Sequence, residues 1–439
     1  MKTFVIGWRL AALSLLATAA LAWPIWRYVS ARLDPAVAAQ MQQAGRELFV
    51  RRWVANDPQA HGDGLGPVFN ANSCVACHFQ GGVGGGGDTA HNVTAYEVHP
   101  TVRDRQLHKG LVHAFAIDKS FVESRALLKT QFPIIPGGDR LVGGCTVKFE
   151  DFDPVRIESV NSIALFGDGL IDRLGESTIR LSHARRVVHQ LGREFSGDFR
   201  TIGAGRPRTL PGGRLGKFGW KAQFATLQEF VAAACANELG LGNPLMEQAK
   251  PLGKSYENGE ADLTRREFRE LVAFVDAIPR PIEVPPGDAR QRARAERGKS
   301  LFRSIGCAEC HTPDLGDVAG IYSDLMLHSL TMKESDGYRH EIIVEVPLPD
   351  DHPKPDEWRT PPLWGVADSA PYFHDGSSQT LESAIARHEG DATLVTKAFK
   401  NLPAEDQQAL IVFLKTLRAP ADVLAPTATP AAGAVAVNK

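Results

Sequence analysis

The sequences CVACH at residues 74–78 and CAECH at residues 307–311 are two copies of one motif, and they dominate the interpretation of this chain. Each has the pattern C-x-x-C-H, which is typical of covalent attachment of a c-type haem. Two thiols three positions apart can each form a thioether with a haem vinyl group, and the adjacent imidazole can then reach the iron. A zinc site would need four protein ligands for each motif, and a redox-active C-x-x-C needs no following histidine. The motifs therefore predict two covalently attached haem c groups.

Each motif supplies two attachment cysteines and one axial iron ligand. The expected haem-binding residues are Cys74, Cys77 and His78 in the first motif, and Cys307, Cys310 and His311 in the second. With His78 and His311 as fifth ligands, the sixth ligand decides whether each iron transfers electrons or carries out chemistry.

Length and composition exclude several other classes of protein. A chain of 439 residues has room for two or three domains. It carries 49 Lys and Arg against 51 Asp and Glu, so it lacks the basic excess that a nucleic-acid-binding protein needs. The 41 glycines and 28 prolines predict many loops.

The chain around each motif repeats a common plan, which predicts a mainly α fold with two cytochrome c-like haem domains. GRELF at residues 45–49 precedes the first motif, and GKSLF at 298–302 precedes the second. Apolar helices over 271–278 and 410–417 close the two units, with start signals at Thr264 and Pro403.

The predicted first domain spans residues 37–280 and the second spans 288–420, with a proline-rich hinge between them. The first domain carries large loop-rich insertions. These include a short β-favouring run at 146–149 and an arginine-dense stretch at 180–186.

The two termini differ from the body of the chain. Residues 1–28 contain an apolar run with small-residue cleavage sites, which predicts a signal peptide or an N-terminal membrane anchor. Bacterial haem attachment takes place outside the cytoplasmic membrane, so we expect the protein in the periplasm. Residues 421–439 are rich in Ala and Pro and are expected to be disordered.

A candidate sixth ligand for the second haem is His388. Leu381, Ala384, Ile385 and His388 share one face of a predicted helix. A single histidine on an apolar face is more often a core residue, so periodicity leaves other candidates open. These are His328, His340, Met326 and Met332.

Further motifs in the second half resemble the bacterial di-haem cytochrome c peroxidases, and most closely the branch called di-haem oxidoreductases or putative peroxidases. The resemblance extends over residues 43–417. It is carried by RTPPLWG at 359–365, APYFHDG at 370–376, TLE at 380–382, GLGPVFN at 64–70, ALFG at 164–167 and FGWKAQ at 218–223.

The resemblance implies a role for His388. In this superfamily, the residue fourteen positions after the histidine of the YFHDG motif is the sixth ligand of the C-terminal haem, and in the peroxidases it is a methionine. Counting from His374 leads to His388. The resemblance therefore implies a bis-histidine iron, with a lower potential than a histidine–methionine iron. His374 itself is expected to be structural.

For the first haem, no second His or Met recurs at a comparable place, so we expect an open sixth position. Trp220 lies in the segment that resembles the peroxidases' aromatic residue between the haems, although a core tryptophan is an equal alternative. The segment 226–240 resembles the one that bears the peroxidases' distal glutamate, but it is two residues shorter. The resemblance makes Glu238 the candidate distal acid.

Two cysteines remain outside the motifs. Cys235 lies close to Glu238 in the sequence, and Cys145 lies in the insertion. Leftover cysteines in an exported protein most often pair, so a Cys145–Cys235 disulfide is the leading expectation. A buried thiol and a thiolate near the first iron are the alternatives.

These features predict a periplasmic di-haem c oxidoreductase, and the resemblance implies a peroxidase-like activity. Peroxide or dioxygen would react at the N-terminal haem, assisted by Glu238. Electrons would pass through Trp220 to the His311/His388 haem and to a periplasmic electron donor or acceptor. One alternative is a non-catalytic di-haem electron-transfer cytochrome with two six-coordinate irons. Another is an enzyme that acts on a large substrate and uses peroxide only as the oxidant.

Overall fold

The computed structural model describes residues 34–101, 104–196, 202–257, 259–330 and 351–421. The expected signal peptide or anchor, His340, Met332 and the terminal tail beyond residue 421 lie outside these described residues. Among the residues that the structure describes, no helix is long and apolar enough to cross a membrane.

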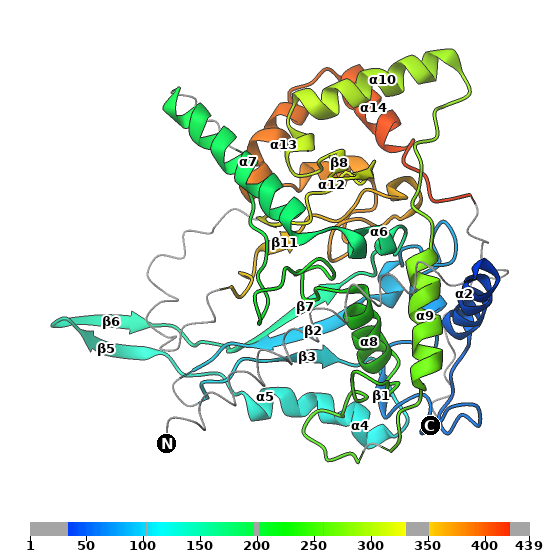
Figure 1. The fold of residues 1–439 in the computed structure, drawn as a ribbon. Coiled ribbons are helices and arrows are strands. Elements are labelled where there is room, and N and C mark those ends of the chain that lie inside the picture. The colour runs from blue at the N-terminus through cyan, green and yellow to red at the C-terminus, as the bar shows by residue number, and fades with distance from the viewer. Residues whose placement is uncertain (1–33, 102–103, 197–201, 258, 331–350, 422–439) are drawn as a thin grey trace, which may run out of the picture.

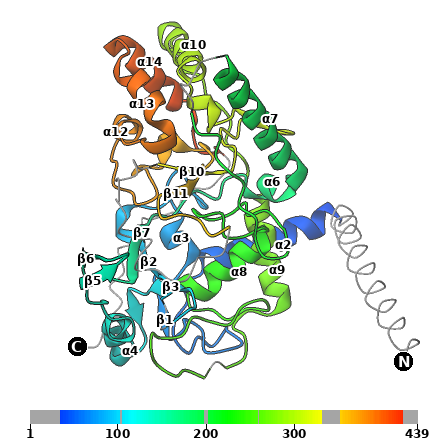
Figure 2. The same ribbon diagram turned by 90° about the vertical axis from the view of Figure 1, so that its left-hand side faces the viewer.

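Two helix pairs correspond to the two predicted units (Figures 1 and 2). Helix α2 (Pro35–Val50) packs on α9 (Arg265–Ala277), and α10 (Ala289–Ser304) packs on α14 (Ala404–Leu414). Each pair crosses at a glycine of the repeated motif, because a side chain there would collide with the partner helix. A Cβ atom at Gly45 would lie 1.8 Å from the Glu270 carbonyl oxygen. One at Gly298 would lie 1.9 Å from the Ala409 carbonyl oxygen.

The closing helices begin where the sequence predicts. Thr264 caps α9, and it forms a reciprocal capping box with Glu267. Pro403 stands at the N-cap of α14. Helix α9 ends two residues before Pro279, but α14 ends at Leu414, well before Pro420. The predicted starts are therefore confirmed.

Separate hydrophobic clusters lie beside the two helix pairs. Phe49, Phe166 and Phe268 belong to the larger cluster, which includes the contacts between α2 and α9. Phe302 and Phe413 belong to the second, between α10 and α14. The division into two cytochrome c-like domains, with its exact boundaries, stays a prediction.

The insertion of the first unit contains an antiparallel sheet, so the fold is mixed and the expectation of a mainly α fold is too simple. Strands β2 (Val93–Val98), β3 (His108–Val112) and β7 (Val155–Val160) form this sheet in the order β3-β2-β7. The hairpin of β5 (Gly138–Val142) and β6 (Cys145–Phe149) projects from it in Figure 1 and confirms the predicted strand at 146–149.

Helix α7 (Glu176–Phe195) is the second difference, because it includes the arginine-dense stretch that we assigned to loop-rich material. Arginine is a good helix former, and no proline interrupts the run.

The remaining elements are α3 (Cys74–Cys77), α4 (Lys119–Glu123), α5 (Leu127–Gln131), α6 (Asp168–Arg173), α8 (Leu227–Glu238), α12 (Leu381–Ala386), α13 (Thr393–Lys400), β1 (Val68–Phe69), β4 (Phe115–Ala116), β8 (Asp314–Leu315), β9 (Val318–Ala319), β10 (Leu327–Ser329) and β11 (Glu357–Arg359).

Candidate haem pockets

Each C-x-x-C-H motif folds into one helical turn. In the first motif this turn is α3, and the backbone N–H of His78 donates to the Cys74 carbonyl over 3.1 Å. In the second, the N–H of His311 donates to the Cys307 carbonyl over 3.0 Å. A turn of this kind carries both thiols and the histidine to the wall of one cavity.

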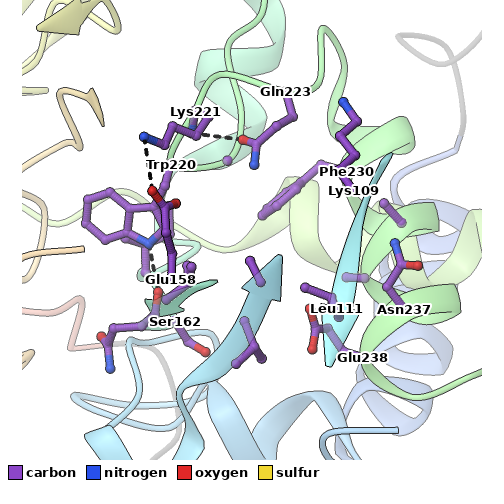
Figure 3. A pocket seen from close by; sticks show the side chains of 18 of the residues that line it. Lys109, Leu111, Glu158, Ser162, Trp220, Lys221, Gln223, Phe230, Asn237 and Glu238 are labelled. Atoms are coloured by element: carbon purple, nitrogen blue, oxygen red, sulfur yellow. Dashed lines mark hydrogen bonds and ion pairs between the residues drawn. The ribbon is translucent and has the colours of Figure 1, made fainter. Parts of the chain in front are cut away.

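The first pocket is a cavity of about 540 Å³ beside the inserted sheet. Its lining includes Cys74, Cys77 and His78, together with Glu238 from α8 and Trp220 from the loop before α8. Figure 3 shows Glu238 and Trp220 on different sides of this cavity. The structure thus brings together all the residues that the sequence predicts for the first haem.

The second pocket is a cavity of about 230 Å³ on the side of α12 and α14. It is lined by Cys307, Cys310, His311 and His388, the residues predicted for the second haem. Trp220 lines this cavity as well as the first.

The three predicted iron ligands share one orientation. Each directs its Nδ1 atom to a backbone carbonyl oxygen: His78 to Gly85 at 3.0 Å, His311 to Tyr322 at 3.0 Å, and His388 to Ala384 at 2.8 Å. Such a bond fixes the ring and leaves Nε2 for a metal, as is usual for metal-binding histidines.

Burial keeps these imidazoles in the neutral form that a metal requires. It lowers the pKa of His78 and of His311 to about 4. The pKa of His388 is also lowered, again mainly by burial. Gly85 belongs to the glycine-rich stretch at residues 81–87 that follows the first motif, so this stretch helps to position His78.

The two histidines of the second pocket face each other across a gap that suits one iron. Their ring centroids are 6.4 Å apart. Two imidazole–metal bonds of about 2 Å each, together with the ring radii, require about 6 Å. Leu381 and Ala384 of α12 are buried, but α12 ends at Ala386, so His388 lies two residues beyond the helix on whose face the sequence placed it.

Buried polar atoms in both pockets also fit haem. Among the described residues, Nε of Arg208 in the first pocket has no protein partner. The same is true of Nη1 of Arg359 and Nε1 of Trp364 in the second. Haem carries two propionate carboxylates, which accept hydrogen bonds from such donors. The residues present therefore fit a haem in each pocket.

Glu238 is a buried acid in the first pocket. Its Oε2 accepts a hydrogen bond of 2.8 Å from Nδ2 of Asn70, and Oδ1 of Asn70 accepts one from the backbone N–H of Ala114. Burial raises the pKa of Glu238 to about 7, although the Asn70 hydrogen bond opposes the shift. A carboxyl group with this pKa can hold or release a proton near neutral pH.

Trp220 lies at the boundary between the pockets. Its indole N–H donates to the Asn161 carbonyl over 2.7 Å, and Asn161 also lines both cavities. The ring is 6.5 Å from that of Trp358 and 6.4 Å from that of His374, centroid to centroid. Trp220 therefore borders both cavities, as does Asn161.

The sequence reasoning missed Trp358. Its ring stacks on His374 at 3.5 Å, and Nζ of Lys221 lies 3.5 Å from its centroid on the ring face. Trp358 lines both pockets. Nothing in its local sequence separates it from an ordinary core tryptophan. The expected packing role of His374 agrees with this stack.

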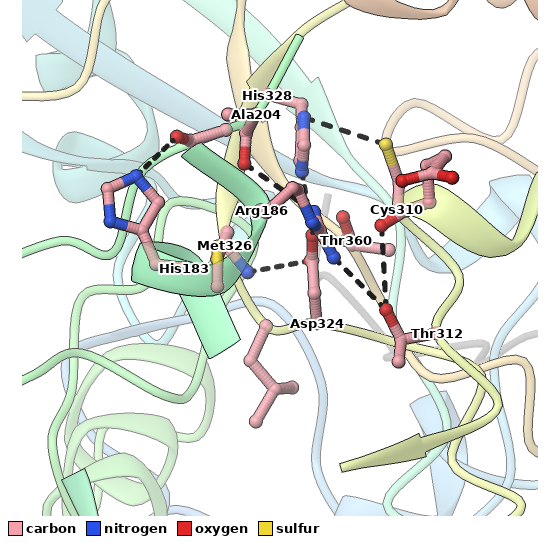
Figure 4. A network of polar contacts seen from close by, with 12 residues as sticks. His183, Arg186, Ala204, Cys310, Thr312, Asp324, Met326, His328 and Thr360 are labelled. Atoms are coloured by element: carbon pink, nitrogen blue, oxygen red, sulfur yellow. Dashed lines mark hydrogen bonds and ion pairs between the residues drawn. The ribbon is translucent and has the colours of Figure 1, made fainter. Parts of the chain in front are cut away.

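The two other described candidates for the sixth ligand of the second haem, His328 and Met326, are either already paired or outside the second pocket. His328 is fully buried and already paired, with Nε2 at 2.9 Å from Asp324 and Nδ1 at 3.6 Å from Sγ of Cys310. Arg186 also pairs with Asp324, as Figure 4 shows. Met326 is buried in the larger hydrophobic cluster and does not line the second pocket.

The expected Cys145–Cys235 disulfide is wrong, because both thiols are free. Cys145 is exposed in the projecting β5–β6 hairpin, whereas Cys235 is buried in α8. Burial raises the pKa of Cys235 well above its usual value, and the residue does not line the first pocket. Of the three interpretations, the buried thiol agrees with the structure.

Comparison with known proteins agrees with this geometry. The model of the family described as "Di-haem oxidoreductase, putative peroxidase" matches residues 147–417. Cytochrome-c peroxidase IdrP1 from Denitromonas iodatirespirans is 27% identical in an alignment 257 residues long that covers 51% of this chain and 64% of that protein. The match thus covers less than two thirds of that relative.

Two solved structures show only distant similarity. Hydrazine synthase from Kuenenia stuttgartiensis shares 16% identity, with a TM-score of 0.33, over 59% of this chain and 73% of that one. A MauG-like protein associated with microbial copper homeostasis shares 21% identity, with a TM-score of 0.32, over 59% of this chain and 94% of that one. TM-scores this low do not establish a common fold. The family match covers more than half of the sequence, and the chain therefore belongs to the di-haem oxidoreductase family of haem-dependent oxidoreductases.

Proposed function

We propose that this protein is a periplasmic di-haem c oxidoreductase that reduces peroxide, or activates dioxygen, in the first pocket. Cys74, Cys77 and His78 would hold the first haem. Cys307, Cys310, His311 and His388 would hold the second, which exchanges electrons with a periplasmic donor or acceptor. The bound haems would supply the redox chemistry, and the polypeptide would supply binding, orientation and protons.

The observation that carries this proposal is the position of Glu238. Its carboxyl group is buried in the cavity that also contains Cys74, Cys77 and His78. A pKa of about 7 is well suited to general acid–base catalysis near neutral pH, and such a group has little structural reason to be buried there. Among the described residues, His78 and His352 are the histidines that line this cavity, and no methionine lines it. His352 is already paired with Glu97 over 3.0 Å.

Glu238 and Asn70 would act together on the substrate. Asn70 fixes the carboxyl group by donating to Oε2, so that the other oxygen, Oε1, is free to face a bound oxygen species. In its protonated form, Glu238 would donate a proton to the departing oxygen as the O–O bond breaks. Removal of such a group typically lowers turnover by about 10²- to 10⁴-fold.

The contrast between the two pockets supports a division of roles. His388 faces His311 across the second pocket, an arrangement suited to electron transfer without substrate binding. Trp220 lines both pockets and would couple them.

The test is steady-state peroxide consumption by the haem-loaded protein with a reduced cytochrome or small-molecule donor. We expect Glu238→Gln to lose about 10²- to 10⁴-fold in kcat/KM while keeping both haems. Glu247→Gln is the matched control, because the Glu247 side chain is 76% exposed and does not line the first pocket. It should behave as wild type.

The electron-transfer alternative makes the opposite prediction. If both haems of the wild type are low-spin and neither responds to peroxide, the protein is a non-catalytic cytochrome. If Glu238→Gln were as active as wild type, Glu238 would have no catalytic role.

A further inference from the structure

Helix α7 carries an apolar stripe that faces away from the protein. Five positions, Leu181, Ala184, Val188, Leu191 and Phe195, are all exposed. The exposed fractions are 51% for Leu181, 68% for Val188, 46% for Leu191 and 90% for Phe195. These are unusual values for four large apolar residues on one helix, so the stripe needs an explanation.

The opposite face of α7 attaches the helix to the body. Ile179 is buried, Nε2 of His183 bonds to the Gly205 carbonyl oxygen, and Arg186 pairs with buried Asp324. Near the end of the helix, a Cβ atom added at Gly192 would meet nothing within 4 Å. Figure 1 shows α7 extending away from the rest of the fold.

The spacing of the stripe identifies the kind of partner. Its members are separated by three, four, three and four residues, which is the a/d pattern of a coiled-coil seam. At 3.6 residues per turn they span only about 80° of the helix circumference. This is narrower than the apolar face of a helix that packs on a broad core or lies in a lipid surface. A stripe of this width is complementary to one further helix.

We propose that a second copy of this chain covers the stripe, with the two α7 helices packed antiparallel. Such a contact is isologous, so the same stripe serves both subunits. Of the charges beside the seam, Arg180 and Glu194 favour this arrangement, whereas exposed Arg185 at an e position faces its own counterpart and opposes it. Arg180 and Glu194 occupy g positions at opposite ends of the stripe, on the same flank. In an antiparallel pair, g positions face g positions, so Arg180 of each copy lies near Glu194 of the other.

The length of the seam sets the strength of the contact. From Leu181 to Phe195 it measures about 21 Å, at 1.5 Å per residue. A stripe of this size buries less than the ~800 Å² per partner of a standard stable interface. The dimer is therefore concentration-dependent.

The test is sedimentation of the haem-loaded protein from about 1 µM to 1 mM, the range in which a weak dimer forms. We expect a monomer–dimer equilibrium for the wild type. Val188→Glu would bury a charge in the seam and should weaken dimerisation at least about tenfold. His189→Glu places the same charge on the neighbouring exposed position, outside the stripe, and should leave the equilibrium nearly unchanged.

A charge swap tests the antiparallel orientation. Arg180→Glu alone should weaken the dimer, because it places two glutamates together, and the double variant Arg180→Glu/Glu194→Arg should restore it. A wild type that stays monomeric at every concentration overturns the proposal, as does a dimer that Val188→Glu does not affect. Monomers that bind vesicles of phosphatidylglycerol and phosphatidylcholine through the stripe would also overturn it. Failure of the double variant to recover would overturn the antiparallel pairing.

Discussion

The first and second pockets start from the same attachment motif but differ in what faces the motif's histidine. In the second pocket, His388 lies opposite His311 at a distance that suits one metal ion. In the first, a protonatable carboxyl group, Glu238, shares a larger cavity with His78. Under the proposed function, one haem-binding plan would serve electron transfer at one site and oxygen chemistry at the other, because the residue on the distal side of the iron sets its role.

The largest expected effect tests whether the two attachment sites are independent. Cys307→Ala should lose most of the stable attachment of the second haem and keep the first, because it removes one of the two thioether-forming thiols of the second motif only. Haem content after acid-acetone extraction measures this. Cys235→Ala removes a buried thiol outside both pockets and should keep both haems. Retention of two covalent haems in Cys307→Ala would contradict the attachment scheme.

Removal of His388 should make the second pocket resemble the first. We expect His388→Ala to convert a low-spin signal to a high-spin signal and to let that haem bind added cyanide or imidazole. In the wild type, cyanide should perturb only the haem attached through Cys74 and Cys77. Electron paramagnetic resonance and absorption spectra report both changes.

Met326→Leu is the control for this substitution, since Met326 is buried outside the second pocket. It should leave the spin state unchanged. If His388→Ala kept every low-spin signal, the sixth ligand would be another residue, with His328 as the next candidate in the second pocket.

A smaller effect is expected at the boundary between the pockets. Trp220→Leu should slow electron exchange between the haems by roughly tenfold, equivalent to about 1.4 kcal/mol of activation free energy. Stopped-flow reduction of the protein, followed at the two haem absorption bands, measures the rate. Trp53→Leu alters a buried tryptophan that lines neither pocket and controls for general effects on packing. Equal rates in wild type and Trp220→Leu would remove Trp220 from the path.

The smallest expected effect concerns pH. Burial raises the pKa of Glu238 to about 7, so its protonated form is present below that pH and is lost above it. If the protonated acid is required, peroxide turnover should fall as pH rises through 7. Asn70 donates to the carboxylate and stabilises its ionised form, so Asn70→Ala should raise the pKa and move this limb upward. One hydrogen bond of about 1 kcal/mol corresponds to a shift of somewhat less than one pH unit. If the fall in turnover occurred at the same pH in Asn70→Ala and wild type, Asn70 would have no influence on the group that titrates.

Local sequence was sufficient to predict several parts of the fold. The start of α9 follows from Thr264 and Glu267, which cap its first turn without help from distant residues. The pairing of Gly45 with α9 and of Gly298 with α14 also agrees with the repeated motif. By contrast, α7 was missed because its apolar stripe does not face the core, so the usual burial pattern is absent.

For the candidate sites, too, sequence-based prediction was limited to residues that are close together in the chain. Cys74, Cys77 and His78 are neighbours in the chain, so spacing alone predicts that they act together. Glu238 could be named only through a family resemblance, and Trp358 was not named at all. Both reach the pockets through the packing of segments that are far apart in the sequence.

The two attachment motifs, the repeated helices and, through the family match, membership of the di-haem oxidoreductases follow from the amino-acid sequence alone. These depend on residues close together in the chain, whose interactions are set by backbone geometry. The folded chain was needed to learn that Glu238 is buried beside Asn70, that Trp220 borders both pockets, and that Cys145 and Cys235 remain apart. The physical reason is that burial, and with it the pKa and the partner of each side chain, is a property of contacts between distant segments.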